Sequence, residues 1–155
     1  AGYADFPLIA FHFEKMHMPD VWIPIMYSLA LGVSALGSLI FGYVYDRFGP
    51  IVFVGIILVS AFFAPCIFLG NFSLEILGMV LWGLGMGAQL SLMRAVIAKR
   101  IPIEKRSTIF GIFTTGYGIA WFLGSALMGF LYTISILWLV IFSSGIQLLA
   151  IPFFL

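Results

Sequence analysis

Long stretches with almost no charged residue most constrain what this chain can fold into. Charged residues make up 8% of the 155 residues, whereas a soluble domain of this size carries about 25%. A helix needs about 20 mostly apolar residues to cross the hydrocarbon core of a bilayer. The sequence therefore predicts an integral membrane protein with five full spans and the last part of a sixth, at residues 21–45, 51–70, 74–93, 107–132 and 134–155, preceded by 1–13.

These runs predict helices rather than strands. Lipid offers no hydrogen-bond partner to the backbone, so only helices and closed barrels span a membrane. Barrel strands have about ten residues of alternating polarity, whereas these runs are longer and uniformly apolar. We expect an all-α, polytopic transmembrane helical bundle that forms one domain over residues 1–155. The chain starts without Met and inside an apolar run, which indicates a piece of a longer protein.

Short segments that carry charge, Pro, Gly or cap residues separate the runs. Ser73 is expected to cap the helix that follows it, with Glu75 in the positive first turn. Six of the seven Lys and Arg residues lie in segments 46–50 and 94–106. Because Lys and Arg concentrate in cytoplasmic loops, these two segments are predicted to be cytoplasmic. We expect a multi-pass protein of the plasma membrane.

Other functional classes find little support. A net charge of +1 gives no basic patch for nucleic acid, and a single cysteine without Cys/His clusters argues against a structural metal. A membrane hydrolase needs a nucleophile beside its base, but His12 and His17 lie near one membrane edge, far from Ser143 and Ser144. We expect these two serines to form hydrogen bonds within their own helix. The sequence thus predicts no enzyme and no cofactor, and a pore-lining filter repeat is absent.

One charged turn has an informative spacing. Gly42, Asp46, Arg47 and Gly49 form a G-x-x-x-D-R-x-G pattern at the end of the first full run. Gly42 lets a neighbouring backbone approach, Gly49 permits a tight reversal, and the charged pair suits a membrane boundary. The pattern resembles the signature loop of the major facilitator superfamily, which lies between helices two and three and again between eight and nine. Pro50 and residue 51 stand where the fuller pattern has two basic residues.

A second loop is similar to the same family. Pro102 and Arg106, with Glu104 between them and Gly111 after them, resemble the Pro-x-x-x-Arg loop between helices ten and eleven. The order of loops and runs is that of helices eight to twelve, with residues 1–13 as the end of helix seven. The resemblance implies the carboxyl-terminal half of a secondary transporter, which works by alternating access with an absent amino-terminal half. A small-molecule substrate and coupling to protons or sodium are implied, whereas uptake and efflux stay open, as does a structural, assembly or receptor-like role.

Small residues recur at every fourth position in two runs. Such ladders let membrane helices pack closely, or slide during a conformational change; they are Ala30, Ser34, Ser38 and Gly42, and then Gly116, Ala120 and Gly124. In the run 74–93, four glycines surround Trp82 and Gln89, which share a helix face. The family resemblance places this helix beside the central cavity. Trp82 and Gln89 are therefore candidates for substrate contact, and the alternative for Gln89 is an interhelical hydrogen bond.

Asp5 is the acidic residue whose position most suggests a function. It lies nine residues before Glu14, which marks the outer interface, and a charge at such depth is costly unless it faces an interior or a water-filled path. Pro7 suggests a bent helix of the kind that lines transporter cavities. We expect Asp5 to couple transport to protons or to bind a cationic substrate; alternatively, it lies in water at a frayed end. The aromatic residues Trp22, Tyr132 and Trp138 are expected in the interfacial belt.

Overall fold

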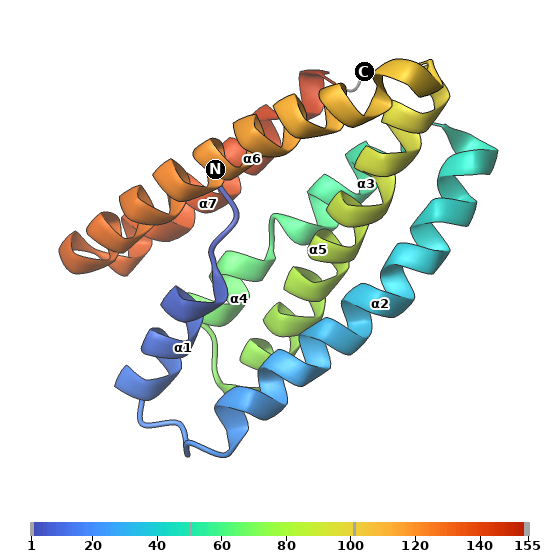
Figure 1. The fold of residues 1–155 in the computed structure, drawn as a ribbon. Helices are drawn as coiled ribbons and strands as arrows, with labels where there is room; N and C mark the ends of the chain where they lie inside the picture. The colour runs from blue at the N-terminus through green and yellow to red at the C-terminus, as the bar shows by residue number, and fades with distance from the viewer. Residues whose placement is uncertain (1, 50, 101, 154–155) are drawn as a thin grey trace.

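The computed structural model describes residues 2–49, 51–100 and 102–153, with side chains except at 90, 92–100, 103, 104 and 153. All regular elements in these residues are helical, which confirms the predicted all-α class (Figure 1). They are α1 (Phe6–Lys15), α2 (Trp22–Phe48), α3 (Ile51–Ser60), α4 (Phe63–Leu69), α5 (Phe72–Arg100), α6 (Ile103–Ile134), α7 (Ile136–Leu149) and the short 3₁₀ helix η1 (Ile151–Phe153). Four segments are long and apolar enough to span a membrane, namely Trp22–Phe48, Ile51–Leu69, Phe72–Gln89 and Lys105–Ile134.

A proline divides the second of the predicted runs into α3 and α4. Pro65 has no backbone N–H to offer the carbonyl of Ala61 four residues earlier, and its ring crowds that carbonyl. The chain accordingly turns at Ala61 and Phe62 before α4 begins. Ser144 of α7 replaces the lost donor, since its hydroxyl donates to the Ala61 carbonyl at 2.8 Å. The break is therefore compensated by a neighbouring helix.

Two further helix ends differ from the sequence-based expectation. Ser73 does not cap α5; the side-chain oxygen of Asn71 accepts the hydrogen bond from the Leu74 N–H at 3.1 Å. α7 begins after Ser135, whose side chain accepts from Leu137 N–H at 3.3 Å, and it has 14 residues. At 1.5 Å per residue this helix is about 21 Å long, which is shorter than the predicted run 134–155.

The closest helix contact joins α2 to α5, which run in the same direction (Figure 1). Gly83 and Gly87 of α5 lie against the backbone of Ala30 and Ser34 of α2. A Cβ atom on either glycine would lie 2.4 Å from the opposing carbonyl oxygen. Small residues on both helices thus permit direct backbone contact, as predicted for the ladder on α2.

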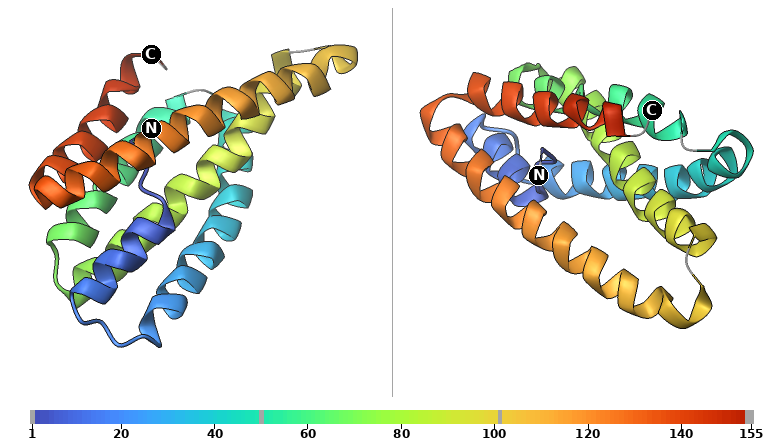
Figure 2. Two further views of the ribbon diagram at one scale, coloured as in Figure 1. Left: turned by 60° about the vertical axis from the view of Figure 1, so that its left-hand side comes forward. Right: turned by 90° about the horizontal axis from the view of Figure 1, so that it is seen from above.

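The ladder on α6 packs only at its last member. A Cβ atom added to Gly116 would meet no heavy atom within 4 Å, and Ala120 is exposed, whereas Gly124 is buried. Two further views show why, because α6 diverges from α5 beyond the turn that joins them (Figure 2). One long face of α6 is therefore left open.

The apolar core lies where α1, α4, α5 and α7 meet. Its fully buried side chains include Ile9 and Phe13 of α1, Ile67 of α4, Met79 of α5 and Leu139 of α7. Large apolar side chains also cover the outer faces of α2, α6 and α7, for example Leu39, which is 74% exposed. An exposed apolar belt around an apolar core suits a domain surrounded by lipid. The core fixes the segment before α1, which carries Asp5.

Candidate functional site

The predicted signature turn is helical over most of its length. α2 continues through Phe48, so Asp46 and Arg47 lie in its last turn rather than in a loop. Gly49 ends the helix with a φ of 69°, and its N–H donates to the Tyr45 carbonyl at 2.8 Å. This φ lies in the left-handed region that favours glycine. Gly49 thus makes the tight reversal that the sequence predicted.

The other signature residues contact their neighbours in different ways. A Cβ atom on Gly42 would lie 3.3 Å from the hydroxyl oxygen of Ser91, so Gly42 sits at the close contact between α2 and α5. The Arg47 guanidinium lies over the ring of Phe48, at 5.6 Å from its centroid. In the second loop, Pro102 precedes α6 and Arg106 is half-buried, whereas the side chain of Glu104 lies outside the described residues.

Trp82 belongs to the packed core of the domain. Its side chain is 2% exposed, and its indole N–H donates to the Ala4 carbonyl at 2.8 Å. The Tyr3 hydroxyl donates to the Trp82 carbonyl, and the two rings stack with centroids 5.7 Å apart. Trp82 therefore holds the segment before α1 against α5. Its side chain is enclosed by packed residues.

Gln89 lies seven residues further along α5, in a different environment. It borders a cavity of about 230 Å³ between α3, α5, α6 and α7, which we call the Gln89 cleft. Tyr117 of α6 donates a hydrogen bond to the Gln89 side-chain oxygen at 2.7 Å. Ser60 and Gln147 line the same cleft and are joined by a 3.3 Å hydrogen bond. The cleft thus combines uncharged polar groups with apolar walls, which is typical of small-molecule sites.

Sequence reasoning missed the polar contribution of α7. The Ser143 hydroxyl donates to the Gly2 carbonyl at 2.6 Å and accepts from Gln147 of its own helix at 3.4 Å, whereas Ser144 donates to Ala61; the expected bonding within the helix is therefore found for Ser143 in part and not for Ser144. Gln147 adds a 3.4 Å contact from its amide nitrogen to the Gly2 carbonyl. Three polar side chains on one side of an otherwise apolar helix were the available signal, since i, i+3 and i+4 positions face the same way.

Asp5 precedes α1 and faces α6. It is half-buried at the N-cap position and its side chain makes no capping hydrogen bond. Pro7 lies in the first turn of α1, where a missing N–H has no cost; the helix begins beside Pro7 rather than bending there, because residues 2–5 are not helical. The Asp5 cleft, about 270 Å³ in volume, is lined by Asp5, Gly118, Trp121, Phe122 and Ser125. The structure therefore brings Asp5 to the open side of the domain, between α1 and α6.

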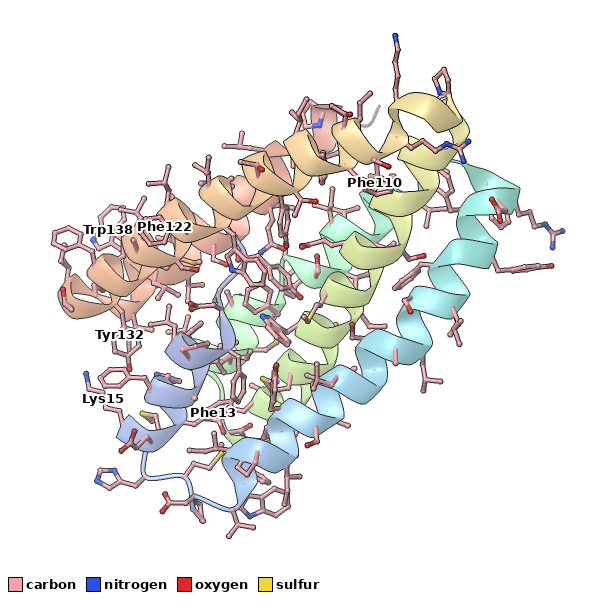
Figure 3. All side chains as sticks on the ribbon, in the orientation of Figure 1. Phe13, Lys15, Phe110, Phe122, Tyr132 and Trp138 are labelled. Carbon is pink, nitrogen blue, oxygen red and sulfur yellow. The ribbon has the colours of Figure 1, made fainter. Side chains whose placement is uncertain are left out.

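A second contact between the α1 region and α6 lies near the carboxyl ends of both helices. His12 is 2% exposed, and its Nδ1 atom forms a 2.9 Å hydrogen bond with the Tyr132 hydroxyl. Lys15 lies over the Tyr132 ring at 5.0 Å from its centroid (Figure 3). Tyr132 is 6% exposed and faces α1 near the end of α6, whereas Trp138 is 59% exposed and points outward (Figure 3).

Comparison with known proteins decides what kind of domain carries these clefts. Residues 6–155 match the sequence profile of the Major Facilitator Superfamily, which is nearly the whole chain. The chain belongs to the major facilitator superfamily. Proteins from Mycobacterium bovis and from Mycobacterium tuberculosis strain H37Rv, both described as uncharacterized, are each 31% identical over 97% of this chain. The chain spans 37% of the length of these relatives, and no solved structure gives a significant match.

Membership in the major facilitator superfamily explains several of the features described above. It accounts for the signature residues at the end of α2 and for the apolar exterior of a membrane-embedded domain. Among the side chains that the structure describes, no group of three His, Cys, Asp or Glu residues could hold a metal ion. Two sets of polar side chains in this major facilitator chain line the Gln89 cleft and the Asp5 cleft, both of which border α6.

Proposed function

We propose that this chain is the carboxyl-terminal half of a secondary active transporter, and that a small solute crosses the membrane by alternating access between it and an amino-terminal half. The observation that carries the proposal is the open face of α6, which borders both polar clefts in a chain of the major facilitator superfamily. A second half set against this face would enclose both clefts. In such transporters, substrate sites lie between two structurally repeated halves.

Asp5 is the proposed coupling residue of this half. It is an ionisable group in an apolar segment, and it borders a cleft rather than the packed core. Exchange of a proton, a sodium ion or a cationic substrate at this carboxylate would change the local charge as the cleft opens to either side. When this segment is joined to its amino-terminal half, Asp5→Asn should abolish accumulation of substrate against a gradient while exchange stays measurable. Unchanged accumulation would assign coupling to another residue.

The proposed setting is the plasma membrane, with segments 46–50 and 94–106 in the cytoplasm. Asp46 and Arg47 then lie at the cytoplasmic end of α2, and Lys105 and Arg106 lie near the start of α6. Concentration of Lys and Arg on one side supports this orientation. The signature residues Gly42, Asp46, Arg47 and Gly49 are proposed to control conformation, because they lie at the end of α2 and away from both clefts.

Alternating access can be tested without knowing the substrate. Gly118 lines the Asp5 cleft and a Cβ atom there meets no heavy atom within 4 Å, so Gly118→Cys should fit. In the two-half protein with Cys66→Ala, a membrane-impermeant thiol reagent should label this cysteine from either side of sealed vesicles. Gly55→Cys is the matched control, since Gly55 is also unobstructed but lines an apolar groove between α2 and α3. It should react from neither side.

The result also separates transport from the alternative role. Labelling of Gly118→Cys from one side alone would favour a structural, assembly or receptor-like protein. The proposal further predicts that the chain by itself, reconstituted in proteoliposomes, takes up no solute, because one half supplies only one wall of the cavity. Saturable uptake by the isolated chain would contradict the need for an amino-terminal partner.

A further inference from the structure

The Asp5 carboxylate has no charged or hydrogen-bonded partner among the described side chains. It makes no capping hydrogen bond at α1. Two basic side chains near the helix ends have other neighbours: Lys15 lies over the Tyr132 ring and Arg47 lies over the Phe48 ring. A carboxylate in an apolar setting requires a counter-charge or a proton. Among the described side chains, none therefore supplies a positive charge to balance the Asp5 carboxylate in its cleft.

Two hydrogen-bonding groups in the wall of the same cleft are also without a partner. The indole nitrogen of Trp121 and the hydroxyl oxygen of Ser125 are buried, yet neither has a hydrogen-bond partner. Buried polar atoms are nearly always satisfied, so such exceptions point to an absent group. Both can donate a hydrogen bond, and the indole can only donate. These two atoms can therefore bind a hydrogen-bond acceptor on a ligand, while the Asp5 carboxylate can bind a positive charge on the same ligand.

Aromatic rings complete the lining of the cleft. Trp121 and Phe122 lie on α6 opposite Asp5, and Trp is the aromatic side chain that attracts organic cations most strongly. Gly118, between α1 and these rings, leaves open space where a side chain would otherwise stand. A hard metal ion would need several oxygen ligands, whereas this cleft offers one carboxylate and one hydroxyl. Its chemistry favours a soft cation with an apolar surface.

We propose that the Asp5 cleft binds an organic ammonium ion that carries an oxygen acceptor close to its charged nitrogen. The Asp5 carboxylate holds the ammonium group, the Trp121 ring contacts its alkyl groups, and Trp121 Nε1 with Ser125 Oγ donates to the ligand oxygen. The cleft has a volume of about 270 Å³, whereas one water molecule occupies about 30 Å³ of the liquid, so the cleft has room for a ligand several times larger than water. The assignment rests on the proposed function, because it names the substrate class of that transporter.

Equilibrium binding of choline to the two-half protein in lipid nanodiscs tests the proposal. Calorimetry should detect choline binding, while its uncharged analogue 3,3-dimethyl-1-butanol should bind on the order of tenfold more weakly because it lacks the charge. Asp5→Asn should lower the affinity for choline on the order of tenfold or more. Glu14→Gln is the matched control, since it removes the other carboxylate of the α1 region outside the cleft and should leave binding unchanged.

Two additional variants keep the test decisive if Asp5→Asn fails to fold. Ser125→Ala and Trp121→Phe should each weaken choline binding, and tetramethylammonium, which lacks the oxygen, should be insensitive to Ser125→Ala. Undetectable choline binding, equal affinity for the uncharged analogue, or equal binding by Asp5→Asn and Glu14→Gln would each overturn the proposal. Binding is measured at equilibrium, without a gradient. A negative result therefore removes the organic cation while leaving the cysteine-labelling test of alternating access unaffected.

Discussion

Gly87→Ala is the most direct test of how α2 and α5 are held together. A Cβ atom at Gly87 would lie 2.4 Å from the Ser34 carbonyl oxygen and 3.1 Å from Ser34 Cα. These are backbone atoms of a long helix, so they cannot move aside as a flexible side chain can. Ordinary contact begins near 3.4 Å. The two helices must therefore separate locally by about 1 Å, the difference between 2.4 Å and 3.4 Å.

The expected cost follows from that separation. A gap approaching 1 Å removes about a quarter to a half of the dispersion energy between facing atoms, and overpacking of this kind costs about 1–3 kcal/mol. Replacing glycine by alanine in a helix also gains up to about 1 kcal/mol of helix propensity. Gly116→Ala shares this gain without the clash, because Gly116 has no heavy atom near its Cβ position. We expect Gly87→Ala to be about 1–3 kcal/mol less stable than Gly116→Ala.

Equilibrium unfolding in mixed micelles with increasing SDS, followed by tryptophan fluorescence, measures this difference. Gly83→Ala should behave like Gly87→Ala, because its Cβ atom would lie 2.4 Å from the Ala30 carbonyl oxygen. The double variant should cost less than the sum of the two, since one separation of the helices relieves both clashes. If Gly87→Ala proves as stable as Gly116→Ala, the backbone contact between α2 and α5 is not as close as described.

Three other predictions concern topology, conformation and the α1–α6 contact. With Cys66 replaced, a cysteine at position 103 should react with an impermeant reagent only from the cytoplasmic side; labelling from outside would reverse the orientation. Asp46→Asn should change the balance of inward- and outward-open states in the two-half protein, with substrate affinity nearly unchanged; a large loss of affinity alone would contradict this. Tyr132→Phe should lower the free energy of unfolding by about 1–3 kcal/mol, because it leaves the buried His12 nitrogen without its partner, whereas Tyr43→Phe at a 71% exposed position should not.

Much of the architecture was predictable from the sequence because it depends on local composition. Uncharged runs of sufficient length predict membrane helices, and their lengths exclude barrel strands. The spacing of Gly42, Asp46, Arg47 and Gly49 predicted the family. The match of residues 6–155 to the family profile confirms this prediction. Gly49 could be identified as a reversal since glycine tolerates a positive φ. The break at Ala61 could also have been predicted from the sequence, because Pro65 removes the hydrogen bond that the Ala61 carbonyl would accept.

The candidate site was predictable only in part. Asp5 and Gln89 attract attention because ionisable and amide groups are costly in an apolar run, and each borders a cleft. Their sequence neighbours do not reveal what they face, however. Trp82 and Gln89 share a helix face, yet one is 2% exposed in the core and the other lines a cleft. The reason is that Tyr3 and Ala4, in the segment before α1, bond to and cover Trp82, whereas Gly2 and Tyr3 only form part of the wall of the cleft that Gln89 borders.

The tertiary structure alone decided which polar groups are satisfied and which face a cleft. Ser143 bonds to Gly2 and His12 bonds to Tyr132, across 141 and 120 residues of sequence respectively. No periodicity records such pairs, because they depend on how helices cross rather than on how each one forms. The sequence by itself determined that these helices lie in lipid, since that follows from the free energy of transferring each run. The positions at which the helices meet follow from packing, above all at the α2–α5 contact. The open face of α6 beside Asp5 follows from the divergence of α6 from α5.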